Sequence, residues 1–365
     1  MQRFLDDDRI SLARKRAPRN LLAATAGAVA LALVATAAQA RDDDDDDAEP
    51  RNGGFCSTTA KLLYSACGFE KKDDHYVAKA KCINFADAGE RSRCLSEAKQ
   101  ARAEAAKLCR EQLDGRRAAC GLLGEARYDP PFGPDLFDSD FRHLSNPNPY
   151  FPLGIGYKWE YRGGIERNVV QVANETKLIE GVTCVVLRDL VYKEGRLAEA
   201  TDDWYAAGRD GSTWYCGEEV KDYESFEGDR PRLPELVKIA GSFKHGRERD
   251  KAGIIMQAHP QAGQVYLEEF SLGNAEDVSE ILSASYAFGS NRELDRFVPR
   301  DLAMRMCNRD CVVTKNYSLL EPGIFALKYY ARGIGFFLET KPDEGKALQL
   351  VDCNFDQRCV ALPKP

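Results

Sequence analysis

The sequence lacks the motifs of several large enzyme classes. It has no G-x-S-x-G nucleophile elbow, no H-E-x-x-H motif and no glycine-rich loop that opens a helix after a strand. Its four histidines, at positions 75, 143, 245 and 259, include no two at helical or strand spacing. These absences argue against α/β-hydrolases, zinc metalloproteases and nucleotide-binding enzymes.

The sequence has fewer basic than acidic residues. The chain has 51 basic and 58 acidic residues, and its formal net charge is −7. The aspartate run 42–47 supplies most of that excess, and the near balance elsewhere argues against a nucleic-acid partner. The run cannot bury anything, so a solvated spacer is expected. Carboxylates suit calcium, but nothing here fixes a coordination geometry, so we predict no metal and no cofactor.

Long apolar runs are absent after residue 40. Before it, a basic segment ending at Arg19 precedes the run LLAATAGAVALALVATAAQA, and Ala38-Gln39-Ala40 fits a secretory cleavage site. The alternative is an uncleaved anchor, for which the run is short and rich in weakly hydrophobic alanine. We expect a signal peptide over 1–40, cut after Ala40, and a secreted or periplasmic protein with no stable membrane span after cleavage.

All twelve cysteines follow the signal, and in an oxidising compartment disulfides are the default expectation. Six of them, at 56, 67, 82, 94, 109 and 120, are separated by 11, 15, 12, 15 and 11 residues, a palindrome. Two antiparallel helices joined near 83–93 would pair Cys56–Cys120, Cys67–Cys109 and Cys82–Cys94. Another of the fifteen connectivities of six cysteines is the alternative. Gly68 to Asp74 is the stretch most able to break the first helix.

The other six cysteines leave several pairings open. Cys184 and Cys216 are two strands apart in a simple meander, which is too far for a bond in a flat sheet. They could bond across a barrel or a different strand order, or Cys184 could be a buried thiol. The last four cysteines predict either a tail tied to an inserted loop or two local bridges, with a zinc site as the sharper alternative. These four are Cys307, Cys311, Cys353 and Cys359.

The chain divides by composition into segments. An acidic disordered leader over 41–54 precedes the disulfide-linked helical hairpin, 55–124. A proline-rich connector, 125–149, carries three phenylalanines (132, 137 and 141), so we expect it to lie extended across the next domain. An antiparallel β domain over 150–352 and a cysteine-containing tail, 353–365, complete the chain.

The β domain is predicted from period-two patterns. In YKWEYRGG the aromatic residues alternate with charged ones before a Gly-Gly turn, and VTCVVLRDLV is apolar enough for a central strand. Glu194-Gly195 and Asp210-Gly211 are hairpin signals. Later β-like runs are VKIAGSF, QVYLEEFSL, CVVTKNYSL, FALKYYA, GFFLET and KALQLVD, while 275–288 is ambiguous between helix and strand. The fold class is therefore α+β, mainly β: a disulfide-stapled helical hairpin before an antiparallel barrel-like or sandwich domain.

Several blocks resemble a family of secreted bacterial all-β proteins of unassigned function. The segments NPYFPLGIGYKWEY, DDWYAAGRDGSTWYCGE, AGIIMQAHP, AEDVSEIL and KYYARGIGFFLE follow that family's order of YFPL, DWYA, AED and KYYA-x-GIG blocks over about 146–340. The family's YAQD is Tyr205-Ala206-Ala207-Gly208 in this chain. The resemblance implies an exported β-rich module and brings no activity with it.

The candidate site residues are carboxylates among aromatic side chains. Asp203, Glu218 and Glu269 are candidate catalytic groups, because carboxyl pairs flanked by stacking rings form saccharide sites. In a β domain such residues more often form a charged face and a packed core. Candidate ligand-binding residues are Trp204, Tyr205, Trp214, Tyr215, His259, Tyr329 and Tyr330.

Three functions fit these patterns. The first, which we favour, is an exported non-catalytic binding module whose curled sheet holds an apolar or amphipathic ligand or docks a cell-envelope partner. The second is a secreted hydrolase that uses carboxylates on a saccharide or another polymer. The third is a structural interaction protein whose helical hairpin is the contact element. The expected partner is accordingly a small apolar ligand or an envelope protein.

Overall fold

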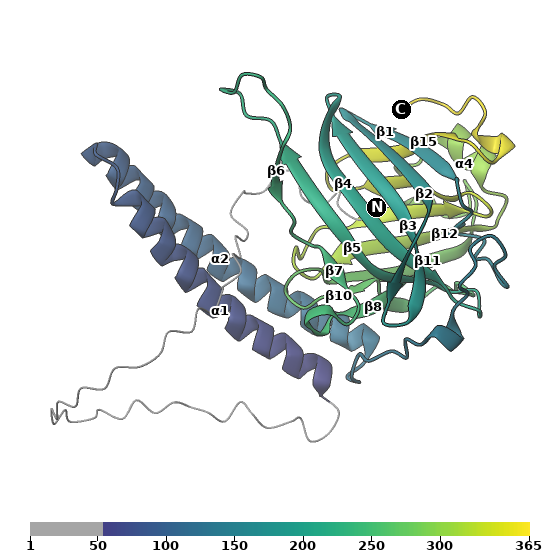
Figure 1. The fold of residues 1–365 in the computed structure, drawn as a ribbon, viewed down its shortest axis with the longest axis horizontal. Helices are drawn as coiled ribbons and strands as arrows, with labels where there is room; N and C mark the ends of the chain where they lie inside the picture. The colour runs from purple at the N-terminus through teal and green to yellow at the C-terminus, as the bar shows by residue number, and fades with distance from the viewer. Residues whose placement is uncertain (1–53) are drawn as a thin grey trace.

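The computed structural model describes residues 54–365, so the expected signal peptide and nearly all of the acidic leader lie outside the described residues. The described chain forms a two-helix arm followed by one antiparallel sheet that curls into a nearly closed barrel (Figure 1). The predicted α+β class, with a stapled hairpin before a barrel-like β domain, is confirmed.

The helical arm consists of α1 (Phe55–Cys82) and α2 (Ala88–Leu123). Three disulfides join the helices in the nested order that the palindrome favours, with Cα–Cα distances of 5.5 to 5.8 Å: Cys56–Cys120, Cys67–Cys109 and Cys82–Cys94. Helix α1 continues through Gly68, the expected weak point, because the adjacent Cys67 is bonded to α2. Asp87 caps α2 by accepting a hydrogen bond from the Glu90 amide at 2.7 Å.

The barrel contains eleven longer strands and four short ones. The longer strands are β1 (Lys158–Gly163), β2 (Glu166–Ile179), β3 (Val182–Lys193), β4 (Arg196–Ala207), β5 (Thr213–Glu224), β8 (Lys251–Met256), β11 (Asp277–Tyr286), β12 (Cys311–Ser318), β13 (Ala326–Ala331), β14 (Gly335–Lys341) and β15 (Lys346–Cys353). The short ones are β6 (Glu235–Lys238), β7 (Phe243–Lys244), β9 (Val265–Leu267) and β10 (Glu269–Phe270). The ambiguous segment 275–288 is therefore strand β11.

The sheet closes through a single segment of chain. The strand order is β10-β8-β5-β4-β3-β2-β1-β15-β14-β13-β12-β11-β9, so its two ends, β9 and β10, are consecutive in sequence. Only Glu268 separates them, and its amide donates to the Asp277 carbonyl at 2.8 Å. Each end strand is short: β9 pairs three residues with β11, and β10 pairs two with β8. The closure is thus the most weakly hydrogen-bonded part of the barrel.

Two predicted turns match the hairpins. Glu194 and Gly195 join β3 to β4 with φ of +50° and +78°, the positive pair that a type I′ turn requires. Gly211, at φ +94°, lies in the turn between β4 and β5. Strands β2 and β8 were not predicted, since the polar ANET stretch interrupts the alternation of β2 where its register shifts. The short helices α3 (Arg292–Asp295) and α4 (Arg300–Met306) were also missed.

The connector crosses the outer face of the barrel, as expected. Its 3₁₀ turn η2 (Pro134–Leu136) leads into Phe137, which is buried and meets Trp214 edge-on with 5.8 Å between ring centroids. Phe132 packs on Phe137 at 5.2 Å. Beneath them lies the Cys184–Cys216 disulfide, so Cys184 is not a free thiol.

This disulfide spans β4. Its Cα atoms are 6.8 Å apart although β3 and β5 are next-but-one neighbours. Cys216 lies in the register shift between β4 and β5. Between β3, which carries Cys184, and β5, which carries Cys216, strand β4 contributes the small side chain of Ala206. A bulge increases local twist and bending, which brings the outer strands together. The flat-sheet argument against this pair therefore fails here because the sheet is strongly curved.

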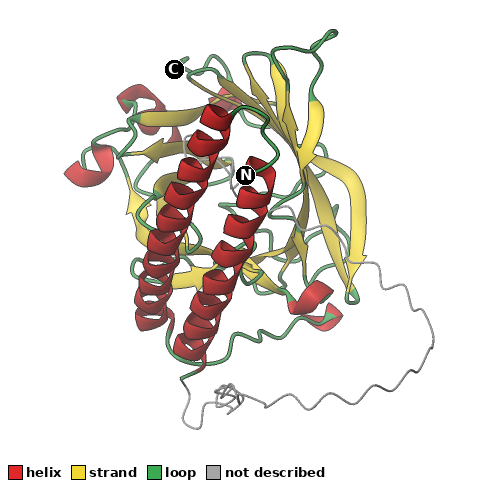
Figure 2. Cartoon of the chain, turned by 90° about the vertical axis from the view of Figure 1, so that its left-hand side faces the viewer, coloured by secondary structure: helices red, strands yellow, loops and turns green. Residues whose placement is uncertain are grey.

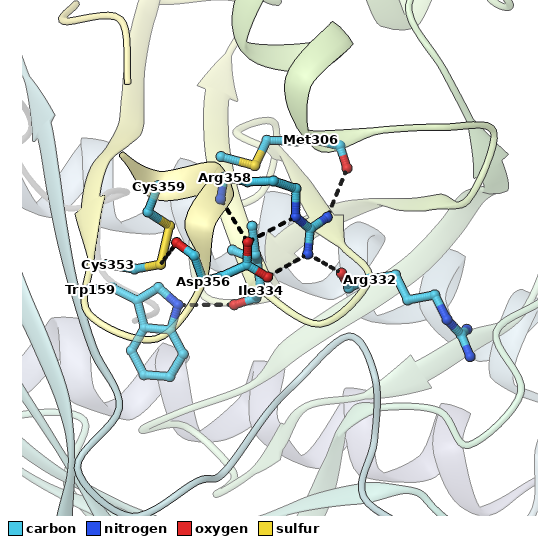
Figure 3. Close-up of polar contacts among 8 residues, drawn as sticks. All are labelled: Trp159, Met306, Arg332, Ile334, Cys353, Asp356, Arg358 and Cys359. Atoms are coloured by element: carbon cyan, nitrogen blue, oxygen red, sulfur yellow. Dashed lines mark hydrogen bonds and ion pairs between the residues drawn. A yellow bond between two sulfur atoms is a disulfide. The ribbon is translucent and has the colours of Figure 1, made fainter. Parts of the chain in front are cut away.

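The last four cysteines form two local bridges, Cys307–Cys311 and Cys353–Cys359, and only the second involves the tail, which has no disulfide to an inserted loop. Arg358 lies in the 3₁₀ turn η4 (Gln357–Cys359). Its guanidinium donates to Asp356 and to the backbone carbonyl of Arg332 (Figure 3). The Trp159 indole donates to the Ile334 carbonyl at 2.9 Å in the same view. These contacts fix the chain end beside β1 and β14.

The arm lies along one side of the barrel (Figure 2) and is attached through α2. The Arg116 guanidinium makes a buried bidentate pair with Glu276, at 2.7 and 2.9 Å. Gln112 donates to the Leu320 carbonyl at 2.8 Å. Ala119 packs with Leu267, Val278 and Leu319 of the sheet. The C-terminal half of α2 is consequently part of the barrel's packing.

Candidate functional site

The predicted site residues on β4 fall on opposite faces of the sheet. Asp203 and Tyr205 face the barrel interior with Leu187 of β3, whereas Trp204 lies in the outer cluster under the connector. This separation follows from the period-two alternation of a strand. The predicted residues therefore divide into an inner group and an outer group.

The inner group begins with a pair of carboxylates. Asp203 and Glu218 are directly opposed on β4 and β5, so their side chains leave the sheet on the same face about 5 Å apart at Cβ. Both are buried. The Tyr215 hydroxyl donates a hydrogen bond to Asp203. Burial raises the pKa of Asp203, and this hydrogen bond partly opposes the rise.

Two stacked tyrosines lie beside this pair. The rings of Tyr205 and Tyr215 are 4.8 Å apart between centroids and 15° from parallel, and Phe151 packs on Tyr205 at 4.9 Å. Burial raises the pKa of Tyr205 well above its usual value. The negative charges of four buried carboxyl groups raise it further: Asp203, Glu218, Glu268 and Glu269.

A second polar wall comes from the other half of the barrel. Asn316 of β12 donates to Glu268 at 2.7 Å and accepts from Thr314 at 2.6 Å. Burial raises the pKa of Glu268 to about 7, while the positive charge of Lys328 works in the opposite direction. Lys328 lies opposite Glu339 in the β13–β14 register. Charged and amide groups thus line this wall.

A third set continues the acidic lining toward β2. Asp189 of β3 is buried, and its burial raises its pKa. The negative charge of Asp203 raises this pKa further, so the two carboxyl groups interact electrostatically. Asn168 of β2 is 4% exposed, and its side-chain oxygen has no hydrogen-bond partner. It lies opposite Tyr161, on the same face as Val170 and hence as Asp189. A buried acceptor therefore faces the acidic interior.

Four predicted residues lie away from this interior. Trp204 and Trp214 belong to the outer cluster, where the Lys177 ammonium lies 3.4 Å from the centre of the Trp204 ring. Tyr329 packs with Tyr286 and donates to the Leu294 carbonyl of α3 at 2.8 Å. His259 is exposed in a loop. This geometry therefore does not support the prediction that these four residues share one site with Asp203.

Tyr330 does belong to the inner group. It is the neighbour of Tyr329 in β13, so it faces the opposite side of the sheet, and it packs on Phe336 at 5.9 Å. Burial raises its pKa well above the usual value, and the charge of Glu268 adds to that rise. The inner group therefore draws its aromatic rings from both halves of the barrel.

An open pocket of about 500 Å³ lies elsewhere, where the β1–β2 and β3–β4 hairpins turn. Arg162, Arg167, Tyr192 and Lys364 line it, and none of the predicted site residues does. Both arginines pair with Glu160, at 2.8 and 2.9 Å. Glu166 also lines the pocket, so two carboxylates offset the two arginines, and the carboxyl groups predicted for the site are all elsewhere.

Within residues 54–365, no group of three or more His, Cys, Asp or Glu side chains could hold a metal ion. No helix in this same part of the chain has the length and apolarity needed to cross a bilayer. Known protein families, characterised proteins and solved structures include no match to this chain. The resemblance to secreted β proteins therefore stays a prediction.

Several interior residues were not predicted, including Asn168, Asp189, Asn316 and Lys328. A signal for one of them was present: Thr314, Asn316 and Ser318 alternate with Val313, Lys315 and Tyr317 along β12. Alternation alone cannot say which face is inside, so these residues could equally have been a solvated face. Asp189, in the mainly apolar run of β3, was the clearer anomaly.

Proposed function

We propose that the protein is an exported, non-catalytic binding module whose barrel interior holds a small amphipathic cation. The observation that carries the proposal is that buried carboxyl groups, among them the directly opposed Asp203 and Glu218, share the barrel interior with the stacked Tyr205 and Tyr215. Carboxylates attract an ammonium or guanidinium group, and the tyrosine faces attract the same cation through their quadrupoles. The apolar body of the ligand would lie on the stacked rings.

The number of strands supports an interior site. Eight strands give an interior that wall side chains just fill, and wider barrels enclose ligands or channels. The main path of this sheet has thirteen strands, of which β9 and β10 together make one pass. The interior wall also carries the carboxyl groups of Asp189, Asp203 and Glu218, so it is not lined by apolar side chains alone.

Asn168 adds an observation that does not depend on the carboxylates. A buried side-chain acceptor without a partner costs on the order of 1–3 kcal/mol, and a ligand that donates a hydrogen bond removes that cost. An ammonium or guanidinium donates several hydrogen bonds and accepts none. The chemistry of Asn168 therefore points to the same class of ligand as the carboxylates do.

The interior favours binding over hydrolysis. A glycoside hydrolase needs its two carboxyl groups on either side of a substrate bond, with a path by which a polymer reaches them. Asp203 and Glu218 lie side by side on adjacent strands, 0% and 4% exposed. A small ligand could enter where β9 and β10 close the barrel, since few hydrogen bonds must open there.

Export supports the same proposal in a coarser way. Six disulfides hold residues 54–365, and disulfides persist in oxidising compartments. We propose that residues 1–40 act as the signal and are removed after Ala40. The module would then meet its ligand in the periplasm or outside the cell. The N-terminal sequence of the protein recovered from the envelope tests the cleavage.

The test of the ligand class uses three probes with the same chain length. Octylammonium, octanol and octanoate are titrated into the purified chain at pH 7, and heat and tyrosine fluorescence are followed. Octylammonium is expected to bind at least tenfold more tightly than octanol, and octanoate least. Equal binding of all three would remove the support for a cation site.

A pair of matched variants locates the binding. Asp203→Asn with Glu218→Gln keeps the shape of the wall but removes two charges, and is expected to weaken octylammonium binding at least tenfold. Asp202→Asn removes a charge from the outer face of the same strand, where Asp202 pairs with Arg188, and should leave the affinity unchanged. Binding that responds to Asp202→Asn and not to the interior pair would place the probe outside the barrel.

A further inference from the structure

Helix α1 and its C-cap residue carry four large apolar side chains at intervals of seven residues: Leu62, Phe69, Tyr76 and the C-cap Ile83. All four are exposed, by 50%, 69%, 65% and 64% respectively. Seven residues turn an α-helix by about 700°, within about 20° of two full turns, so these side chains form one straight row. We call this row the α1 stripe. Exposed aromatic side chains in such regular order indicate a surface made for contact.

The stripe faces away from the rest of the molecule. Helix α1 contacts α2 through its other side, where Ala60 and Cys82 are buried and Cys67 is bonded to Cys109. His75, on that side too, lies 3.0 Å from the Ala98 carbonyl of α2. Phe69 follows Cys67 by two residues and is therefore about 200° further round the helix, on the side opposite α2. Neither α2 nor the barrel covers the stripe.

A spacing of seven is the period of a helix that packs against another helix in a left-handed coiled coil. Between the large residues, the second seam position holds Ala66, Asp73 and Ala80, all exposed and small. The seam thus alternates large and small side chains along its whole length. In an antiparallel copy centred between Lys72 and Asp73, Phe69 of one helix lies beside Tyr76 of the other and Leu62 beside Ile83, so the large apolar side chains meet each other.

The charges at the middle of the stripe are also complementary to themselves. Lys71 and Lys72 are followed directly by Asp73 and Asp74. When a second copy of α1 runs antiparallel across this point, the lysines of one helix lie beside the aspartates of the other. A parallel copy would place lysine beside lysine. The charge pattern therefore favours an antiparallel copy of the same helix, in the register that also sets Phe69 beside Tyr76.

We infer that the α1 stripe is a self-association surface, on which a second copy of this chain docks α1 against α1 antiparallel about a two-fold axis. Such a two-fold contact uses the same patch on both subunits, as the self-complementary seam requires. The inference does not depend on the proposed ligand, because the stripe lies on the arm and the ligand residues lie in the barrel. The disulfide ladder presents the stripe on a rigid support, which limits the entropy lost on docking.

The dimer is expected to be weak. The stripe extends over about 32 Å at 1.5 Å per residue, and one helix pair of that length buries less than the roughly 1,200 Å² of a standard interface. We expect a dissociation constant on the order of 10 µM. Sedimentation equilibrium of the exported chain from about 1 to 300 µM measures it. A monomer throughout that range overturns the inference.

Matched variants show whether the stripe is the contact. Phe69→Lys with Tyr76→Lys changes only exposed side chains, and should weaken dimerisation at least thirtyfold with the helical circular dichroism unchanged. Leu108→Lys alters an apolar residue of α2 that is 41% exposed and off the stripe, and should dimerise like the parent. A dimer that survives the first variant, or is lost with the second, overturns the assignment.

A charge exchange tests whether the partner is a second copy. Two double variants are made. Lys71→Glu with Lys72→Glu makes the four central charges all negative, and Asp73→Lys with Asp74→Lys makes them all positive. Each variant alone should therefore remain monomeric. An equimolar mixture of the two should form a heterodimer in native mass spectrometry. Homodimers of either variant, or no heterodimer in the mixture, contradict the antiparallel contact.

Discussion

The helical arm and the barrel differ in what holds them together. In the arm, the buried side chains of α1 are only Ala60 and Cys82, and the helices are joined by three disulfides. The barrel has a continuous core that reaches from Tyr161 to Leu350 and across β3 and β14. A chain with little apolar surface to bury needs covalent links, whereas a large sheet does not.

The comparison also shows where the two regions become one. The half of the arm nearest the turn at 83–87 extends beyond the sheet, while the C-terminal half of α2 packs on it (Figure 1). Arg116 and Gln112 are the polar links. All three tryptophans belong to the barrel, so their fluorescence reports its unfolding, and the ellipticity at 222 nm reports mainly the helices.

Removal of the whole disulfide ladder is expected to have the largest effect. Serine at Cys56, Cys67, Cys82, Cys94, Cys109 and Cys120 should remove about 2–4 kcal/mol for each bridge from the arm. The helical signal should fall, and amides of 68–100 should exchange rapidly. Tryptophan fluorescence and the β signal should persist. Joint loss of both signals would show that arm and barrel unfold as one unit.

Replacement of Arg116 tests the contact between the helical arm and the barrel. Arg116→Met leaves the Glu276 carboxylate buried without its cation and should lower the free energy of barrel unfolding by about 3–5 kcal/mol. Arg116→Met with Glu276→Gln should recover most of that loss. The exposed Arg117→Met is the matched control. Urea unfolding followed by tryptophan fluorescence measures all three, and an equal effect of Arg117→Met would contradict the assignment.

Glu268 should make the barrel sensitive to pH in a way that the arm is not. Its pKa is raised to about 7, so the neutral acid is the form that the folded state favours. The stabilisation is fully present below about pH 4.5 and is lost as the pH rises through 7, by about 3 kcal/mol. Glu268→Gln should flatten this dependence between pH 5 and 8. The exposed Glu227→Gln should keep the parent's profile of melting temperature against pH.

The helix cap at Asp87 should give the smallest effect, confined to the arm. Asp87→Ala removes the acceptor for the Glu90 amide and is expected to cost about 1 kcal/mol of helix stability at the outer turn. Asp87→Ser retains a capping oxygen and should restore it. Amide exchange over 83–95 reports the change. A shift in the tryptophan transition would mean that the outer turn is coupled to the barrel.

Much of the arm could be predicted from the sequence, because its information is local. The palindromic cysteine spacing and the strong helix formers of residues 94–120 act within two neighbouring helices. The turn at Glu194-Gly195 is local in the same sense. The docking of α2 on the sheet was not predictable, since Arg116 and Glu276 are 160 residues apart and either could have been a solvated charge.

The site was predictable only in part. Asp203, Tyr205, Glu218 and Tyr215 were identified from their residue types and do lie together. Trp204 and Tyr329 were grouped with them because they are adjacent in sequence, yet strand alternation turns them to the opposite face. Which face is inside depends on how the sheet curls, and that is settled by pairing between distant strands.

The sequence by itself determined the disulfide ladder, the helical arm, most strands and their hairpin turns, since each of these follows from periodicity or spacing within a few tens of residues. Only the tertiary structure decided the closure at Glu268, the bond from Cys184 to Cys216 across β4, and the burial of Asp203 and Glu218 in one interior. The physical reason is that curvature and strand register bring together residues whose local patterns are compatible with many different neighbours.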